Sequence, residues 1–321
     1  MSDIKVFSGS VHREFAEEIC RHLKISLSEV ILKKFHDSET YVKYLEKVRG
    51  EDVFIIQPTS RPVNESLMEL LIMIDALKRS SVNRINIVVP YYGYARQDRR
   101  ASAREPITAK LVANLLTAAG ADRIVTVDLH SPQTVGFFDI DVDHFEAYPL
   151  FAEYFRKKNL KDIVAVASDS GFAKKTRKFA KLMECPMAII DKRRQVHNKA
   201  EIVNVIGEVK GKICLLIDDM IDTGGTVSKS ADALMEKGAK EVYIAATHAV
   251  FSGDAVEKLE KCGAKEIIVT DTVPIPKEKR ISKLKILSVA ELMAQVIQRI
   301  HDHKSLGELF SWEEKVDVRH K

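Results

Sequence analysis

A repeated block of sequence constrains the fold of this chain more than any other feature. Residues 108–131 align without a gap onto residues 226–249, and each copy reads as a helix, a glycine and a strand. An apolar strand precedes each copy, at Ile85–Val89 and at Ile213–Ile217. Any two αβ units resemble each other to some degree, but the matched order of strand, loop, helix and strand favours a duplicated domain. The identical pairs are Thr108/Thr226, Ala113/Ala231, Leu116/Leu234, Gly120/Gly238, Ala121/Ala239 and His130/His248.

Along the whole chain, short β-branched runs alternate with stretches of helical periodicity. This alternation indicates parallel sheets with helices on both faces. We expect strands at Ile4–Phe7, Val53–Gln57, Ile85–Val89, Ile124–Val127, Ile163–Ser168, Met187–Ile190, Ile213–Ile217, Val242–Ala245, Ile267–Thr270 and Leu284–Leu287. We expect helices at Asn64–Arg79, Pro106–Ala119, Gly171–Met183 and Thr226–Lys237.

The composition excludes several classes of protein. A length of 321 residues suits two domains. A formal charge of +4 is nearly neutral for this length and argues against a protein that coats nucleic acid or an anionic membrane. The start resembles no signal peptide, no apolar run is long enough to span a membrane, and the four cysteines have no paired spacing. We therefore expect a cytoplasmic protein with no nucleic-acid partner, no membrane partner, no zinc site and no disulfide framework.

The loops that follow the repeated strands differ in length. We expect the loop of the second copy at Asp218–Gly225 and the much longer loop of the first copy at Pro90–Glu105. In open parallel sheets, ligands bind at the carboxyl ends of strands, where such loops gather. These two loops are therefore the candidate sites for chemistry.

The second-copy loop combines three carboxylates with a glycine-rich helix start. Asp218 and Asp219 end an apolar strand, Asp222 follows, and the helix opens with Thr223, Gly224, Gly225 and Thr226. Backbone N–H groups and hydroxyls at a helix N-terminus bind phosphate. Carboxylates accept hydrogen bonds from sugar hydroxyls, directly or through a divalent cation. A helix cap alone needs one such side chain, so the set predicts a sugar-phosphate pocket.

The stretch LLIDDMIDTGGT resembles the signature of the phosphoribosyltransferase superfamily, and the chain contains no Walker or dinucleotide-binding pattern. Other segments are similar to the ribose-phosphate pyrophosphokinase family, of its class I type. These segments include PYYGYARQDRR at 90–100, VDLHSPQTVGFFD at 127–139 and IDKRR at 190–194. The resemblance runs from about residue 4 to about residue 310, and that family is a tandem duplication, in agreement with the repeat.

The resemblance implies an α/β fold of two tandem phosphoribosyltransferase-like domains, each a mostly parallel sheet flanked by helices. We expect an ATP-side domain at 1–147, a ribose 5-phosphate-side domain at 148–287, a helical region at 288–310 that packs on the first domain, and a tail at 311–321. The implied activity is Mg²⁺-dependent transfer of the diphosphate of ATP to the 1-hydroxyl of ribose 5-phosphate, which gives 5-phosphoribosyl 1-diphosphate and AMP. Such chemistry needs a metal clamp, cations and two substrates held in line.

On the nucleotide side, the resemblance assigns ATP binding to two segments. Phe35 would stack on adenine and its neighbours would contact the base edge. Without the family, the first segment reads as an exposed turn and strand, and the arginine run through Arg99, Arg100 and Arg104 reads as a solvated surface. The implied ATP contacts are Phe35, Asp37, Ser38, Glu39, Arg96 and Gln97.

The resemblance also assigns metal and catalytic residues. It implies that His130 and Asp169 bind Mg²⁺, although a histidine at a strand end is more often structural and magnesium prefers oxygen ligands. It implies that Lys192 and Arg194 neutralise charge on the transferring diphosphate from a mobile loop that excludes water. Arg194 would bind ribose 5-phosphate as well, together with the residues of the acidic–glycine loop from Asp218 to Thr226. Taken alone, cations after a buried strand are commonly only its polar exit.

The chain departs from the family pattern at two places. Phe172 stands where the family usually has the second of two glycines, which predicts a crowded backbone approach beside Asp169. Family members of this type form hexamers, need inorganic phosphate and are inhibited by ADP through a site that corresponds here to Lys47, Arg49, Arg104 and residues 305–310. Because lysine supplies positive charge where the family commonly has serine, Lys47 predicts a weakened phosphate dependence.

Two other functions stay open. A phosphoribosyltransferase shares the acidic–glycine loop, but those enzymes generally lack a first half with PYYGYARQDRR. A non-catalytic regulatory paralogue loses parts of the catalytic loop or carries insertions, whereas Lys192, Arg194 and His130 are all present here. Only Phe172 favours the paralogue.

Overall fold

The computed structural model describes residues 4–193 and 202–310 and divides the chain into two units. Unit 1 takes the described residues up to Glu146, with Thr272–Pro274 and the described residues from Ser288 onward. Unit 2 takes Ala147–Asp271 and Ile275–Leu287. The chain therefore returns to unit 1 twice, briefly at Thr272–Pro274 and again from Ser288.

Unit 1 contains a fully parallel five-stranded sheet in the order β1-β4-β5-β6-β7. Every residue of β4 is buried, as expected for a parallel strand with both faces covered. The first four strands in this order lie where the apolar runs predicted them, within one residue at each end, whereas β7 was not predicted. The strands are β1 (Ile4–Ser8), β4 (Asp52–Ile56), β5 (Arg84–Val89), β6 (Arg123–Val127) and β7 (Asp141–Phe145).

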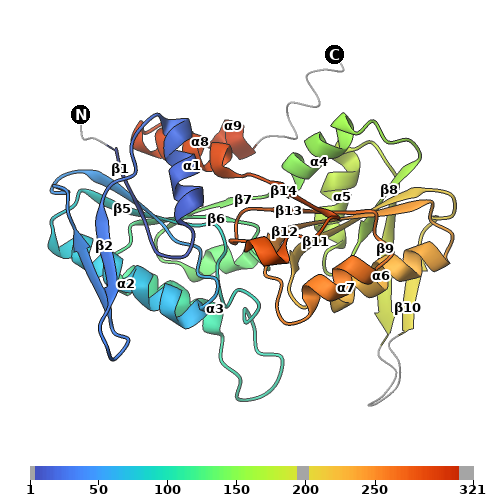
Figure 1. Cartoon of the computed structure of the whole chain (residues 1–321), viewed down its shortest axis with the longest axis horizontal. Helices are drawn as coiled ribbons and strands as arrows, with labels where there is room; N and C mark the ends of the chain where they lie inside the picture. The colour runs from blue at the N-terminus through green and yellow to red at the C-terminus, as the bar shows by residue number, and fades with distance from the viewer. Residues whose placement is uncertain (1–3, 194–201, 311–321) are drawn as a thin grey trace. The chain divides into compact units, whose positions relative to one another are not determined.

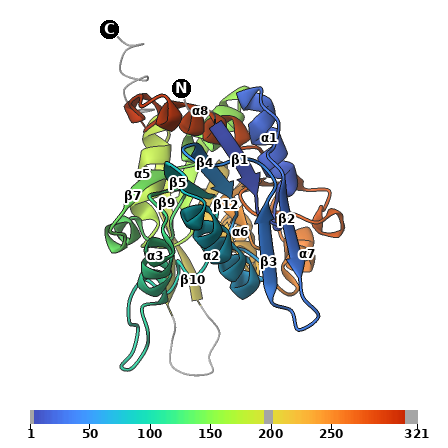
Figure 2. The ribbon, with the colours of Figure 1, turned by 90° about the vertical axis from the view of Figure 1, so that its left-hand side faces the viewer.

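Helices cover both faces of this sheet (Figure 1, Figure 2). On one face, α2 (Val63–Arg79) and α3 (Thr108–Ala119) bury a cluster that includes Leu70 and Leu116. On the other face, α1 (Arg13–Leu23) packs beside α8 (Ala290–His301).

The helix α8 is tied to the sheet by a buried carboxylate. Asp52 Oδ2 lies 3.0 Å from His301 Nδ1, and the Arg84 guanidinium bonds both to Asp52 and, at 3.5 Å, to the Ile300 carbonyl oxygen. Burial raises the pKa of Asp52, but hydrogen bonds from Arg84, Asn83 and His301 outweigh it and hold that pKa below its ordinary value. The last described segment, α9 (Gly307–Phe310), follows α8.

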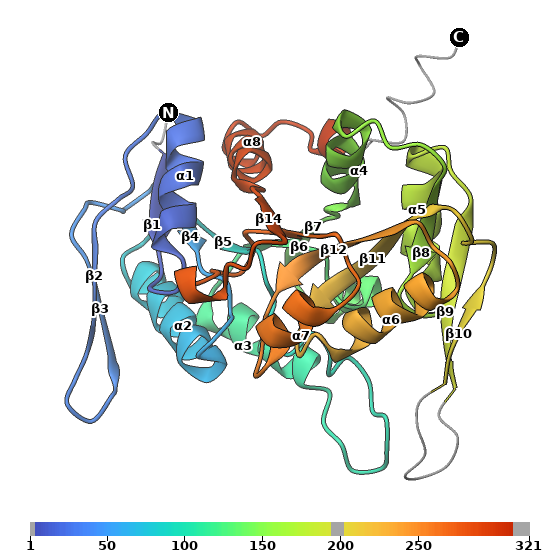
Figure 3. The same cartoon turned by 45° about the vertical axis from the view of Figure 1, so that its right-hand side comes forward.

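A separate antiparallel hairpin, β2 (Val30–Lys34) with β3 (Thr40–Tyr44), extends from unit 1 (Figure 3). The Tyr44 hydroxyl donates to the Met73 carbonyl oxygen at 3.0 Å, which anchors the hairpin to α2. The short 3₁₀ helix η1 (Pro132–Phe137) lies between β6 and β7.

Unit 2 contains a seven-stranded sheet in the order β10-β9-β8-β11-β12-β13-β14. Only the β10–β9 pair is antiparallel among these strands. Helices α4 (Tyr148–Lys157) and α5 (Ala173–Leu182) lie on one face, and α6 (Gly225–Glu236) and α7 (Ala255–Lys261) on the other (Figure 1). The strands are β8 (Ile163–Ala167), β9 (Met187–Arg193), β10 (Ile202–Ile206), β11 (Ile213–Ile221), β12 (Glu241–Ala249), β13 (Glu266–Thr270) and β14 (Leu284–Leu287), with the 3₁₀ helix η2 (Lys277–Lys279) between the last two.

The predicted fold class is confirmed, because each unit is a mostly parallel sheet flanked by helices. Both copies of the repeat end their helix in the same way. Gly120 and Gly238 have φ angles of 118° and 84°, and the N–H of the next residue donates to Leu116 O at 3.2 Å in one copy and to Leu234 O at 3.0 Å in the other. The ends of the four predicted helices differ from the observed ends by at most two residues. No helix in the described part of the chain is long and apolar enough to cross a membrane.

Candidate active site

The acidic pair lies inside strand β11 rather than in a loop. Asp218 pairs with Ala246 of β12, and the pairing continues to Ile221. The predicted loop from Asp218 to Gly225 is therefore wrong, and only residues 222–224 connect the strand to α6. The partner strand β12, which also runs for nine residues, supplies the backbone hydrogen bonds that extend β11. As a result, the ladder itself fixes the backbone that carries both carboxylates.

The two neighbouring carboxylates differ in their surroundings. Asp219 is 5% exposed, whereas Asp218 is partly exposed and its Oδ1 accepts the Asp219 N–H at 2.9 Å. Burial, and then the charge of Asp219, raises the pKa of Asp218 well above its ordinary value. A ligand that brings hydroxyl donors or a cation to this strand end would relieve the cost of the two charges.

The start of helix α6 has the geometry of an anion site. Gly224 precedes the helix with a φ of 71°, and a Cβ at this position would lie 3.1 Å from the Ala255 carbonyl oxygen. A residue other than glycine would be strained here. Gly224, the N-cap residue of α6, has no side chain with which to cap the helix, and the N–H groups of a helix's first turn are the groups that bind phosphate. Thr223 and Thr226 are exposed on either side of this turn.

Asp169 reaches the same edge of the sheet from the neighbouring strand. β8 pairs with β11 in parallel, with Ala167 opposite Ile217, so Asp169 follows its strand beside the acidic pair. Asp169 is exposed, and its Oδ1 accepts the Phe172 N–H at 2.9 Å. Phe172 has a φ of −85°, which any residue adopts, and its ring lies 5.4 Å from the Lys175 ammonium. The backbone at this position therefore does not require the glycine of the family pattern.

The catalytic pair expected from the sequence is only partly described. Lys192 lies within β9, where it pairs with Val203 of β10, so the expectation that it follows a strand ending at Ile190 is wrong. Arg194 lies outside the described residues.

In unit 1, a long loop connects β5 to α3 (Figure 1). Gly93 lies against Thr59, since its N–H donates to Thr59 Oγ1 at 2.7 Å and a Cβ would lie 2.4 Å from Thr59 O. Arg96 and Gln97 follow and are exposed. The Thr108 hydroxyl donates to Gln97 Oε1 at 2.5 Å, which ties the loop to the first residue of α3.

The tip of this loop is organised by one carboxylate. Glu105 Oε2 accepts the N–H groups of Ala101 and Ser102, both at 2.8 Å, and the Ser102 hydroxyl donates to Oε1 at 2.7 Å. These bonds, led by that of the Ser102 side chain, hold the pKa of Glu105 below its ordinary value. The surrounding cations Arg99, Arg100 and Arg104 are exposed.

The other predicted ATP contacts lie in the turn of the β2–β3 hairpin. The Phe35 N–H donates to Glu39 O at 2.9 Å, and the Glu39 N–H donates to Asp37 Oδ1 at 3.1 Å. Ser38 closes the turn with a φ of 76°. The Phe35 ring is 56% exposed, with the Tyr41 ring 5.8 Å away in an edge contact. An exposed ring of this kind is able to stack on a planar base.

His130 lies beyond the end of its strand. β6 ends at Val127, so the expectation that His130 ends the strand is wrong, and its side chain is exposed. Across the described residues, no three or more His, Cys, Asp or Glu side chains come together as a metal site. Magnesium is commonly held by one or two carboxylates with substrate phosphates, and the exposed carboxylate of Asp169 is chemically suited to that mode.

Models of two protein families match this chain. The N-terminal domain of ribose phosphate pyrophosphokinase matches residues 4–120, and the phosphoribosyl synthetase-associated domain matches residues 193–311. A ribose-phosphate pyrophosphokinase of Fusobacterium nucleatum is 52% identical over 312 residues, which cover 97% of this chain and 99% of the relative. One of Bacillus subtilis is 51% identical over 309 residues, or 96% and 98% of the two chains.

The chain belongs to the ribose-phosphate pyrophosphokinase family. The crystal structure of a phosphoribosylpyrophosphate synthetase from Mycobacterium smegmatis has the same fold, with a TM-score of 0.90 and 45% identity over 94% of this chain and 100% of that one. The family predicted from the sequence is therefore confirmed.

Sequence reasoning missed residues that support these loops rather than line them. The Thr59 hydroxyl oxygen accepts the Gly93 N–H, and the Glu105 carboxylate accepts N–H groups of the loop tip. Neither residue lies in the motifs that carry the resemblance to the family. Glu105 offered one signal, because in the Ser-x-x-Glu spacing the glutamate side chain bonds back to the serine N–H. Thr59 offered none, since its partner lies in a different loop.

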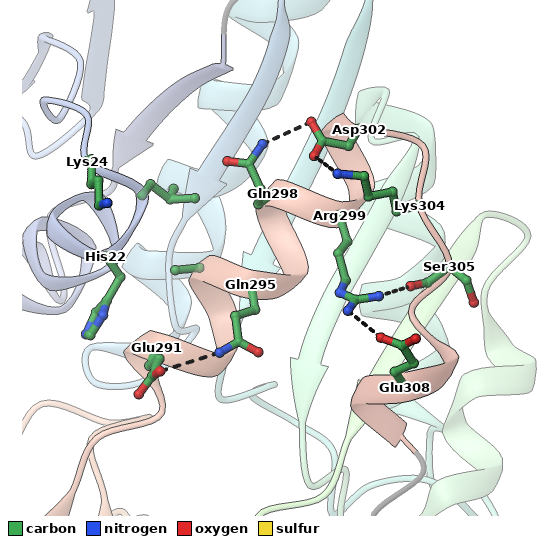
Figure 4. A pocket seen from close by; sticks show the side chains of 12 residues that line it. His22, Lys24, Glu291, Gln295, Gln298, Arg299, Asp302, Lys304, Ser305 and Glu308 are labelled. Carbon is green, nitrogen blue, oxygen red and sulfur yellow. Dashed lines mark hydrogen bonds and ion pairs between the residues drawn. The ribbon is translucent and has the colours of Figure 1, made fainter.

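A further pocket in unit 1 lies away from these carboxyl ends (Figure 4). It encloses about 860 Å³ between the end of α1 and the helices α8 and α9. Two ion pairs join residues that line this pocket: Arg299 bonds Glu308 at 2.6 Å, and Lys304 bonds Asp302 at 2.9 Å. Of the predicted regulatory residues, Ser305 and Glu308 line this pocket, whereas Lys47, Arg49 and Arg104 do not. Those three residues are exposed in loops of unit 1, and the regulatory role stays a prediction.

Proposed function

We propose that this protein transfers the diphosphate of ATP to the 1-hydroxyl of ribose 5-phosphate and releases AMP. The observation that carries the proposal is the carboxyl end of β11, where two adjacent carboxylates are followed by a helix start with glycine at the N-cap, in a chain of this family. Such an edge suits a ligand with both vicinal hydroxyls and a phosphate. The ribose 5-phosphate contacts would be Asp218, Asp219, Asp222, Thr223, Gly224, Gly225 and Thr226, with Arg194 as a further contact.

The proposal assigns ATP to unit 1. The exposed Phe35 ring offers a stacking surface for adenine, and the exposed Arg96 offers positive charge to the phosphates. Asp37, Ser38, Glu39 and Gln97 would supply the polar contacts to the nucleotide. Lys192 and Arg194 would neutralise the transferring diphosphate.

Magnesium is the proposed cofactor, with His130 and Asp169 as the residues that would hold it. When bound, it would supply positive charge against the phosphate oxygens. Asp169 would use the oxygen that does not accept the Phe172 N–H. A homo-oligomer, a hexamer by family resemblance, also stays a prediction.

The proposal is tested by incubating the protein with ATP, Mg²⁺ and ribose 5-phosphate and then separating and identifying the nucleotide products. AMP that forms only when the sugar phosphate is present supports the proposal. ADP as the product, or no nucleotide product, contradicts it. A regulatory paralogue gives no product and stimulates or inhibits an active relative. A phosphoribosyltransferase instead consumes 5-phosphoribosyl 1-diphosphate together with a base and needs no ATP.

A further inference from the structure

The backbone between β6 and His130 adopts an unfavourable conformation. Asp128 has a φ of 42°, in the left-handed region, although it is not glycine and its side chain is only 5% exposed. This conformation is uncommon for L-residues, although aspartate adopts it more often than most of them. Such strain persists only where the surroundings hold it in place, and it is common beside functional groups.

Strand β7 holds this backbone through two hydrogen bonds. The Asp128 N–H donates to the Phe145 carbonyl oxygen at 2.8 Å, and the Leu129 N–H donates to Nε2 of His144 at 3.0 Å. The first bond extends the β6–β7 ladder, and any residue at position 145 would supply it. The second bond depends on the side chain, so His144 is the one residue of this pair whose identity matters.

The imidazole of His144 is long enough to meet the Leu129 N–H and has a nitrogen lone pair that accepts it. His144 lies opposite Thr126 in the β6–β7 register, and its half-buried ring extends to the backbone of Leu129, two residues beyond the end of β6. A nitrogen that accepts from an N–H carries no proton itself, so His144 holds its proton on Nδ1 in this arrangement.

We propose that His144 is a positioning residue for His130. By accepting the Leu129 N–H, it fixes the strained turn whose next residue is His130, and so fixes the direction in which the His130 side chain leaves the sheet edge. The inference rests on the proposed function, in which His130 would bind the magnesium complex of ATP. Partners that orient a ligand residue commonly contribute 10- to 100-fold to metal affinity or activity.

The test compares two substitutions of nearly the same shape. His144→Gln keeps an acceptor oxygen close to the position of Nε2, whereas His144→Met removes the strong acceptor and keeps the length. His22→Met serves as the matched control, because His22 is an exposed histidine of α1 outside the proposed site. Each protein is measured for AMP formation and for calorimetric affinity toward Mg²⁺ with a non-hydrolysable ATP analogue. Hydrogen exchange of residues 127–131 is measured as well.

We expect His144→Met to bind the magnesium–analogue complex about 10-fold more weakly and to lower kcat/KM about 10- to 100-fold. The Leu129 amide should exchange faster in this variant, because its acceptor is gone. We expect His144→Gln to stay within about 3-fold of the wild type in affinity and turnover, with wild-type exchange at Leu129. His22→Met should match the wild type throughout.

A His144→Met protein with wild-type affinity and turnover overturns the inference. A His144→Gln protein as impaired as His144→Met also overturns it, whatever their melting temperatures, because the acceptor is then not the decisive property. Wild-type protein that forms no AMP contradicts the proposed function itself, whereas normal wild-type activity with an unaffected His144→Met contradicts only the role of His144.

Discussion

In the second copy of the repeat, β11 runs for nine residues and residues 222–224 suffice to reach α6. In the first copy, β5 runs for six residues and residues 90–107 separate it from α3. The helices that follow end with the same glycine geometry. The two copies therefore share their scaffold and differ where each strand ends, which is the edge where ligands bind in such sheets.

The aligned histidines show how far the copies have diverged. His248 lies inside β12 and is 2% exposed, whereas His130 lies past the end of β6 and is exposed. The difference follows from strand length, because β12 continues to Ala249 and β6 stops at Val127. An identical residue at an equivalent position of a duplicated domain thus gives no guide to its role.

The two copies hold their charged and polar side chains on different kinds of backbone. Asp218 and Asp219 belong to a hydrogen-bonded ladder, which fixes their backbone. Arg96 and Gln97 belong to a loop that is held by side chains such as Thr59 and Glu105. Groups on a regular element are held more closely in place than groups on a loop. Substitutions in the second copy should therefore affect the proposed activity more strongly.

The largest effect is expected from Asp218→Asn. A hydrogen bond to a charged group contributes about 1.5–3 kcal/mol, so its loss should raise the KM for ribose 5-phosphate about 10- to 100-fold, as measured from initial rates of AMP formation. Asp162→Asn is the matched control, since this exposed carboxylate precedes β8 at the opposite end of the same sheet. An unchanged KM in Asp218→Asn contradicts the sugar contact.

The same substitution should stabilise the protein without ligand. Because the pKa of Asp218 is raised in the folded state, its carboxylate form opposes folding, and stability falls as the pH rises from the ordinary carboxyl range through the raised pKa. Asp218→Asn removes this loss. Denaturant titrations at acid and neutral pH should therefore show a smaller decrease for the variant than for the wild type, and an equal decrease would contradict the electrostatic account.

An intermediate effect is expected from Gly224→Ala, with Gly225→Ala as its control for stability. Alanine at 224 would have to adopt a φ of 71° with its Cβ near Ala255 O, which costs about 1–2 kcal/mol. At 225 the nearest atom to a Cβ, Thr223 Oγ1, is 3.9 Å away, and alanine favours a helix. Thermal unfolding should show a lower melting temperature for Gly224→Ala alone, accompanied by about 10-fold weaker ribose 5-phosphate binding. Equal melting temperatures would show that the turn tolerates a side chain.

The sequence predicted the central strands well because they carry their signal locally. β4 and β8 are short β-branched runs buried on both faces, so each residue contributes to the pattern. β7 was missed because DVDHF alternates charged residues with apolar ones at the edge of the sheet, where one side faces solvent. The residues of the acidic–glycine loop were found because they are contiguous in the chain.

What the sequence did not predict depends on partners that are distant along the chain. The extension of β11 through Ile221 requires β12, so the carboxylates read locally as the start of a loop. The bond between Leu129 and His144 joins the turn after β6 to β7, and neither segment carries a local sequence signal for it. The pairing of Gly93 with Thr59 crosses from one loop to another. Such contacts are set by the register of the sheet, which a single sequence does not contain.

The smallest effect is expected from Glu105→Gln in the first copy. The amide keeps the shape of the side chain, but a neutral oxygen accepts the N–H groups of Ala101 and Ser102 less strongly than a carboxylate. We expect an unchanged melting temperature, because the loop tip is exposed. We expect the KM for ATP to rise about 3-fold, because the loop that carries Arg96 is less firmly held. Asp98→Asn is the control: it removes the same charge from the same loop, and Asp98 accepts no hydrogen bond within the part of the chain that the structure describes.

If both variants raise the KM for ATP equally, the loop acts only through its net charge. If Glu105→Gln changes the KM as much as Asp218→Asn does, the loop of the first copy is as closely fixed as the ladder of the second, and the contrast between the copies does not hold.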